Sequence, residues 1–443
     1  MVAKAPTDEQ PGLRRSIGTT QLALYALGSM VGSGIYGLIG KAAGEAGSAV
    51  WLSFLVAMFA ALLTALSYAS LGSRYPRAGG AAYVTDRAFG IPVLSFTIGL
   101  ALVASGLTSI ATQAKIFAAI LADLTGFDLL SPTGIAVGFL LIMSGIVFRG
   151  IRESMWVNVL CTLLEVSGIL LVIAAGFSYW GTVDYFETPA GSSETGVALV
   201  VLQASVLTFF AFIGFEDAIN VAEECKDPQR TIPRGLIIAT ASAALLYVAV
   251  SITAVSVLPW QELAAAPSPL TAVLQRAAPS IPTELMSFIA LFSVANTALV
   301  NYVTASRLIY GMSGQGLLPG FVGRVHTTRR TPHVAIAVIL ALLLLLVVAG
   351  EIADLAAATV LLLLIVFIAV NASLVVLKRR KGEALGHFEI PLFLPITGIV
   401  VCAALVVTRV ASTDWRAPAL AGALLALILC FYAALRMMPT KIR

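Results

Sequence analysis

Charged side chains are scarce in this sequence. They make up 11% of its 443 residues, whereas an average soluble domain has about 25%. Hydrophobic residues reach 59%, and the mean hydropathy is +0.96. A soluble protein of this length needs polar groups to cover its surface. The composition therefore excludes a soluble fold and predicts that a lipid bilayer surrounds most of the chain.

Cysteine and histidine are also rare, which argues against metal and redox sites. The four cysteines form no CxxC pair, and the three histidines lack neighbours at metal-ligand spacing. We find no nucleotide-binding loop, nucleophile–base arrangement or filter repeat, so the sequence predicts neither an enzyme with a cofactor, nor an ATP-driven pump, nor a channel. The net charge of +4 is no sign of nucleic acid binding, because the basic residues are distributed by membrane topology.

Apolar stretches long enough to cross a bilayer, about 20 residues each, recur along the chain. They lie at 20–43, 47–73, 88–122, 132–148, 153–177, 196–221, 234–258, 281–312, 333–350, 354–377, 391–411 and 415–436. The sequence thus predicts an all-α integral membrane protein with twelve transmembrane helices. The polar first fifteen residues lack the features of a cleaved signal peptide, so we expect the first helix to be retained.

The basic residues predict the orientation of these helices. If the N-terminus lies inside, the inner segments hold 22 Lys or Arg and the outer loops hold four. Basic residues favour the cytoplasmic side. We therefore expect a multi-pass protein of the cytoplasmic membrane with both termini in the cytoplasm.

The first stretch carries a cluster of small residues at mid-membrane. It reads Gly28-Ser29-Met30-Val31-Gly32-Ser33-Gly34. One interpretation is close packing against another helix. The other is local unwinding, which would expose amide hydrogens that suit a carboxylate and carbonyls that suit an ammonium.

The sixth stretch combines a glycine with aromatic and acidic residues. Phe209 to Asp217 reads FFAFIGFED. Either this helix ends early at the interface, or it is interrupted and its acids face a cavity. The first and sixth helices are five apart, which is the spacing expected for two broken helices in an inverted repeat.

Several separated motifs are typical of one transporter family. They are Gly28 to Tyr36, Tyr68 to Gly80 (YASLGSRYPRAGG), Phe210 to Glu216, Glu223 to Gly235 (EECKDPQRTIPRG) and Arg307 to Pro319 (RLIYGMSGQGLLP). In this order they make the chain resemble the amino acid–polyamine–organocation (APC) transporters over about residues 12–380.

This resemblance implies a LeuT-like fold. The whole chain, 1–443, would be a single transmembrane domain with a 5+5 inverted repeat and discontinuous helices 1 and 6. The first repeat would occupy 1–177, the second 196–377, and helices 11 and 12 would follow at 391–436.

The resemblance also implies a binding site at the two breaks. The solute carboxylate would meet the amides of Ser33, Gly34 and Ile35, and its amino group would meet carbonyls near Met30 and on the sixth helix. The implied substrate-binding residues are Met30, Val31, Ser33, Gly34, Ile35, Phe210, Ala211, Phe212 and Ile213. Phe210 would close over the solute as a gate.

Glu165 departs from the family pattern, because proton-coupled relatives often carry a lysine at this place. An intramembrane acid is usually functional. Its burial favours a protonated form that suits a proton carrier, whereas an ionised form beside Ser293, Asn296 and Thr297 of the eighth helix would suit sodium. The remaining alternative is a structural hydrogen bond.

The sequence thus predicts a secondary active transporter of amino acids that works by alternating access. The pocket around Phe210, Phe212 and Ser105 looks mostly apolar, which favours neutral solutes, and Glu165 favours proton coupling. The alternatives are a transporter of amines such as ethanolamine or a polyamine, and an uncoupled or sodium-coupled amino acid exchanger. No cofactor or metal is expected.

Overall fold

The computed structural model describes residues 13–125, 131–189, 197–266, 268–349, 353–410 and 416–437. Within these ranges the regular structure is helical, apart from a single bridge between Ile17 and Cys225. The α-helices are α1 (Thr19–Met30), α2 (Ser33–Ala46), α3 (Val50–Arg74), α4 (Gly80–Phe89), α5 (Pro92–Thr125), α6 (Pro132–Arg149), α7 (Ile151–Gly176), α8 (Val197–Phe210), α9 (Asp217–Asn220), α10 (Pro228–Val257), α11 (Trp260–Ala265), α12 (Pro269–Ala277), α13 (Thr283–Gly314), α14 (His333–Ala349), α15 (Ala353–Arg379), α16 (Phe393–Val410) and α17 (Arg416–Met437).

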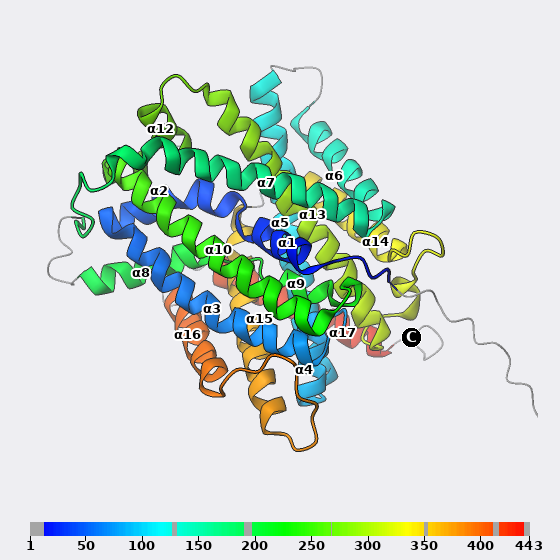
Figure 1. The fold of residues 1–443 in the computed structure, drawn as a ribbon. Coiled ribbons are helices and arrows are strands. Elements are labelled where there is room, and N and C mark those ends of the chain that lie inside the picture. The colour runs from blue at the N-terminus through cyan, green and yellow to red at the C-terminus, as the bar shows by residue number, and fades with distance from the viewer. Residues whose placement is uncertain are drawn as a thin grey trace, which may run out of the picture.

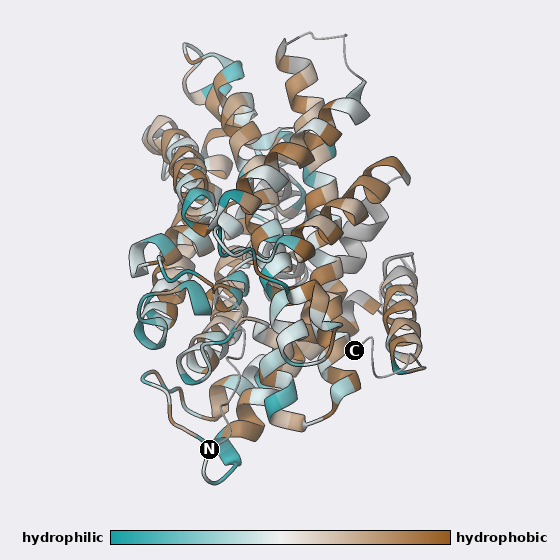
Figure 2. Cartoon of the chain, turned by 90° about the vertical axis from the view of Figure 1, so that its right-hand side faces the viewer, coloured by the Kyte–Doolittle hydropathy of each residue, from teal (hydrophilic) through white to brown (hydrophobic). Residues whose placement is uncertain are grey.

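The helices are membrane-type in length and composition. Within the described ranges, seven helical segments are long and apolar enough to cross a membrane. Four shorter apolar helices coincide with the expected sixth, ninth, eleventh and twelfth stretches. Hydrophobic residues colour most of the helical ribbon, and hydrophilic ones gather in loops and at helix ends (Figure 2). An all-helical membrane protein is confirmed, while the count of twelve stays a prediction.

The expected first helix is interrupted. α1 ends at Met30, α2 begins at Ser33, and Gly32 between them has an extended backbone. Close packing also requires these glycines. A Cβ on Gly28 would lie 2.0 Å from Thr162 Oγ1, and one on Gly32 would lie 2.4 Å from Thr297 Oγ1. The helix is therefore interrupted at this cluster, and its glycines also pack closely against neighbouring helices. Binding of a solute by the freed amides and carbonyls stays a prediction.

The expected sixth helix is interrupted as well. α8 ends at Phe210, and turns lead through Gly214 to the four-residue helix α9. Gly214 has a φ of +126°, and a Cβ there would lie 2.7 Å from the Ser29 carbonyl carbon. Glycine alone permits both this conformation and this close approach, so Gly214 brings the two breaks into contact.

The two breaks lie inside the bundle, among α1, α5 and α13 (Figure 1). α13 packs along α5, and α3 packs along α10. α1 contacts α7 and α10. α16 packs against α15 and α3, and α17 packs against α15 and α5.

Candidate functional site

A cavity of about 140 Å³ lies between the two breaks. A cavity of about this size, roughly 150 Å³, can hold a molecule as large as benzene. Its lining residues are Ser29, Met30, Gly32, Gly34, Leu102, Ser105, Gly106, Ser109, Thr112, Gln113, Ile213, Gly214, Glu216, Asp217, Thr297, Asn301, Thr304, Ala305 and Leu363. The space thus suits a small solute in contact with α1, α2, α5, α13, α15 and the segment after α8.

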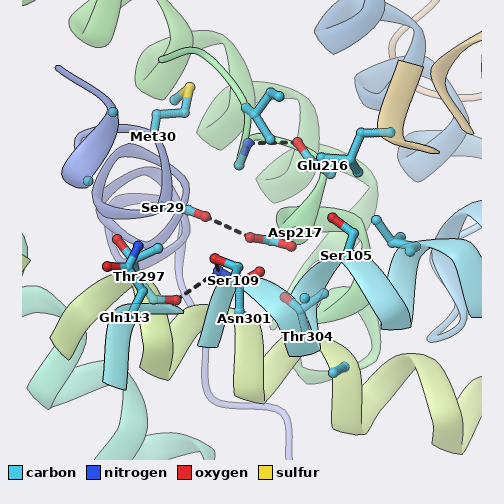
Figure 3. A pocket seen from close by; sticks show the side chains of 18 of the residues that line it. Ser29, Met30, Ser105, Ser109, Gln113, Glu216, Asp217, Thr297, Asn301 and Thr304 are labelled. Atoms are coloured by element: carbon cyan, nitrogen blue, oxygen red, sulfur yellow. Dashed lines mark hydrogen bonds between the residues drawn. The ribbon is translucent and has the colours of Figure 1, made fainter. Parts of the chain in front are cut away.

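Hydroxyl, amide and carboxyl groups line much of this cavity (Figure 3). None of the described lining residues is Lys, Arg or His. Two of them, Glu216 and Asp217, are acids that are only 3% and 4% exposed. The cavity therefore has acidic groups on one side. Its described lining offers no basic side chain that could pair with a second carboxylate on a solute.

The two acids have different partners. Asp217 Oδ2 accepts a 2.6 Å hydrogen bond from Ser29 Oγ across the two breaks, and the two side chains point toward one another in Figure 3. Glu216 Oε2 accepts from the backbone amide of Gly214 at 2.8 Å. Glu216 thus stabilises the turn in its own segment, whereas Asp217 reaches the opposite segment.

The start of α2 forms another part of the cavity wall. Its N-cap is Gly32, which makes no side-chain cap hydrogen bond to the first amides. Gly32 and Gly34 both line the cavity. The first amides of a helix lack internal acceptors and attract negative charge, so this end of the cavity can receive a carboxylate.

The carbonyls at the two breaks already accept a hydrogen bond. The buried hydroxyl of Tyr247 on α10 lies 2.7 Å from Met30 O and 2.9 Å from Ala211 O. These are carbonyls that the family resemblance assigns to the solute's amino group.

Some of the residues expected at the site line the cavity and others do not. Met30, Gly34, Ile213 and Thr297 line it. Val31, Ile35, Ala211, Phe212, Ser293, Asn296 and Glu165 are almost fully buried outside its lining. The side chains of Ser33 and the expected gate Phe210 are outside the part that the structure describes.

The expected pocket around Phe210, Phe212 and Ser105 is only partly found. Ser105 lines the cavity. The Phe212 ring instead packs edge-on against the Tyr247 ring, with ring centroids 5.0 Å apart. α8 ends at Phe210, and the turns that begin at Ala211 place the Phe212 side chain outside the cavity lining.

Glu165 lies in a neighbouring polar cluster between α7 and α13. Asn158 Nδ2 donates to Asn296 Oδ1 at 2.8 Å, and Asn296 Nδ2 donates to Thr162 Oγ1 at 3.0 Å. Tyr36 of α2 donates to the Glu165 backbone carbonyl at 3.0 Å. Asn296 faces the Glu165 carboxyl group, but neither carboxyl oxygen has a partner at hydrogen-bonding geometry among the described residues.

Several lining residues were not assigned to the site from the sequence. Asn301 and Thr304 continue the helical spacing from Thr297, and that spacing was the available signal. On α5, Ser109 and Thr112 or Gln113 continue the same periodicity from Ser105, which was expected in the pocket. Asp217 had a weaker signal, its position directly after Glu216.

Comparisons with known proteins agree with a transport site. The family model of amino acid permeases matches residues 17–433. The chain is 28% identical to a branched-chain amino acid permease of Bacillus subtilis over 419 residues, which cover 90% of this chain and 88% of the relative. It is 29% identical to a methylthioribose transporter of the same organism, with coverages of 88% and 86%. It is 30% identical to cationic amino acid transporter 4 of Mus musculus, with coverages of 84% and 61%.

These relatives are transporters and not enzymes. The family match from residue 17 to residue 433 includes both interrupted helices and the described residues that line the cavity. The chain therefore belongs to the amino acid permease family of the APC transporters.

Proposed function

We propose that this protein is a secondary active transporter that carries neutral amino acids across the cytoplasmic membrane by alternating access, driven by the proton gradient. The observation that carries the proposal is the cavity between the two breaks, with uncapped amides at α2 and acidic side chains at the segment after α8. An amino acid carries a carboxylate that suits the amides and an ammonium group that suits the acidic side chains.

The lining supports a neutral solute over an acidic one. A second carboxylate on the solute would have no Lys, Arg or His among the described lining residues. An unpaired charge in such a site is strongly disfavoured. One relative is named for branched-chain amino acids and another for cationic ones, and the small volume of the cavity favours the shorter side chains.

Helix contacts support two inverted halves for alternating access. We assign α1/α2, α3, α5, α6 and α7 to the first half, and α8/α9, α10, α13, α14 and α15 to the second. α3 then packs on its equivalent α10, and α5 packs on its equivalent α13. α1 contacts α10, and the equivalent helices α8 and α3 also contact each other. Likewise, α7 contacts α13, and the equivalent helices α15 and α5 contact each other. A two-fold relation between the halves produces such matched contacts.

Glu165 supports proton coupling. An ionised carboxylate in the membrane interior needs a counter-charge or several donors. Glu165 is fully buried, and its carboxyl oxygens lack hydrogen-bond partners in the described structure. A protonated carboxyl group avoids this penalty, so Glu165 suits a residue that gains and loses a proton during transport. Sodium coupling through oxygens of α13 and a purely structural role are the competing possibilities.

Uptake into liposomes tests the proposal. We expect purified protein to accumulate labelled leucine, alanine or methionine when the lumen is alkaline relative to the bath, and to leave glutamate outside. Accumulation that follows a sodium gradient instead would contradict proton coupling. Failure to transport any amino acid while carrying ethanolamine or putrescine would favour the amine alternative.

A further inference from the structure

This inference rests on the proposed function and concerns the recognition of the solute's amino group. We propose that Asp217 binds the protonated amino group of the solute. The hydrogen bond from Ser29 would hold the carboxylate toward the first break, where the bound solute lies.

Two of the backbone carbonyls at the breaks already share a hydrogen-bond donor. The single Tyr247 hydroxyl lies 2.7 Å from Met30 O and 2.9 Å from Ala211 O. Ala211 is 1% exposed and does not line the cavity. A carbonyl also offers only a partial charge, whereas a carboxylate offers a full one, and hydrogen bonds between charged groups are the stronger kind.

Asp217 is a buried acid without a cation. It is 4% exposed and forms no ion pair among the described residues. Arg307 of α13 is already engaged, because its Nε and Nη2 donate to the two carboxyl oxygens of Glu224 at 3.0 and 3.1 Å. A buried carboxylate is costly unless a positive group meets it. Since the described lining residues offer none, an ammonium group on the solute would supply this charge.

Glu216 is a weaker candidate for the same role. Its Oε2 accepts from the Gly214 amide within the same turn. That bond helps to maintain the positive-φ conformation of Gly214, which the contact between the breaks requires. Asp217, by contrast, reaches across to α1 through Ser29. The structure therefore gives the two adjacent acids separate tasks.

This placement defines the chemical class of the solute. Asp217 lies in the same cavity as Gly32 and Gly34, whose helix start presents uncapped amides. The cavity that contains both groups has a volume of about 140 Å³. A solute that contacts both therefore carries its ammonium and carboxylate groups close together, as α-amino acids do. An analogue in which a hydroxyl replaces the amino group would keep the carboxylate contacts and lose the contact with Asp217.

Binding of matched ligands tests this assignment. The probes are leucine and its 2-hydroxy analogue, measured by calorimetry on the purified full chain in lipid nanodiscs. We expect wild-type protein to bind leucine more tightly than the hydroxy acid. Asp217→Asn should weaken leucine binding at least about tenfold and change hydroxy-acid binding less than about threefold, because only the ammonium contact is lost.

Two further variants test whether the effect is specific to the carboxylate of Asp217, as opposed to misfolding or the loss of any negative charge in the cavity. Glu216→Gln removes the neighbouring charge and should reduce the preference for leucine over the hydroxy acid less than Asp217→Asn does. Asp217→Glu restores a carboxylate and should recover part of that preference. Unchanged leucine affinity in folded Asp217→Asn would overturn the assignment of Asp217 and leave the proposed function intact. A loss of preference in Glu216→Gln as large as that in Asp217→Asn would have the same meaning. If the wild-type protein binds and transports no amino acid, the proposed function fails, and this assignment fails with it.

Discussion

The Tyr247 hydroxyl lies 2.7 Å from the carbonyl oxygen of Met30, the last residue of α1. The same hydroxyl is 2.9 Å from the carbonyl oxygen of Ala211, directly after α8. Its ring is fully buried and packs against the rings of Phe54 and Phe212. One phenol on α10 thus connects both interrupted helices where their regular hydrogen bonding stops.

Tyr247→Phe should lower the thermal unfolding midpoint and weaken leucine binding. Two buried carbonyls would lose their donor, a loss of about 1–3 kcal/mol. The breaks would also be held less firmly around the cavity. Thermal unfolding in detergent with and without leucine measures both effects.

Tyr302→Phe is the matched control for this change. Tyr302 is also fully buried, and it donates to Ile336 O at 2.9 Å between α13 and α14, away from the cavity lining. We expect it to lose stability without losing leucine affinity. Equal affinity losses in both variants would mean that Tyr247 has no special relation to the breaks.

Gly34→Val should abolish stabilisation by leucine while the protein still folds. Gly34 lines the cavity at the start of α2, and a β-branched side chain there would obstruct a carboxylate that approaches the amides. Gly138→Val on α6 is the control, because a Cβ at Gly138 meets no atom within 4 Å. A normal leucine-induced shift in the Gly34 variant would contradict carboxylate binding at this helix start.

Glu165→Gln should retain leucine exchange and lose accumulation driven by a pH gradient. Glutamine resembles the protonated carboxyl group in shape but cannot release a proton. Glu153→Gln, at an exposed position in the first turn of the same helix, should accumulate leucine normally. Counterflow and gradient-driven uptake in proteoliposomes distinguish the two activities. Normal gradient-driven accumulation by Glu165→Gln would leave this residue only a structural role.

Glu389 should make stability depend on acidic pH. Burial raises the pKa of its carboxyl group, but hydrogen bonds from Arg74, Lys378 and the Gly386 amide outweigh burial and lower the pKa to about 2. Its ordinary value is 4.5. A carboxyl group with a lowered pKa stabilises the folded state above its unfolded pKa, and this contribution is lost as pH falls toward the folded pKa.

The stability difference between wild type and Glu389→Gln should therefore be largest near pH 7 and should shrink between about pH 4.5 and 2. Thermal unfolding across this range measures it. Glu262→Gln is the control, because its pair with Arg276 is about half exposed on both sides and exposed pairs contribute little. A constant difference across the pH range would contradict the role of the ionised Glu389.

Helix positions and the two interruptions could be read largely from the sequence. Runs of apolar residues define helices locally, because backbone groups in a membrane must bond within their own segment. Gly32 and Gly214 mark the interruptions for a similarly local reason, since glycine lowers helix stability wherever it stands. The buried partner of Arg307 could not be read in this way, and the structure identifies it as Glu224.

The polar contacts of the site depend on tertiary packing. Helical spacing along α13 indicates that Thr297, Asn301 and Thr304 share a face, but it does not say which helix that face meets. Tyr247 is a single tyrosine in an apolar helix, with no pattern that predicts its hydrogen bonds.

The sequence by itself determined a helical membrane protein, and it marked Gly32 and Gly214 as the places where one of two interpretations puts a break. Only the tertiary structure decided that Ser29 meets Asp217, 188 residues away. The physical reason is that this contact depends on the height and rotation of one segment relative to the other. Both are set by the close approach of Gly214 to the Ser29 backbone, and by the packing of neighbouring helices that no local pattern records.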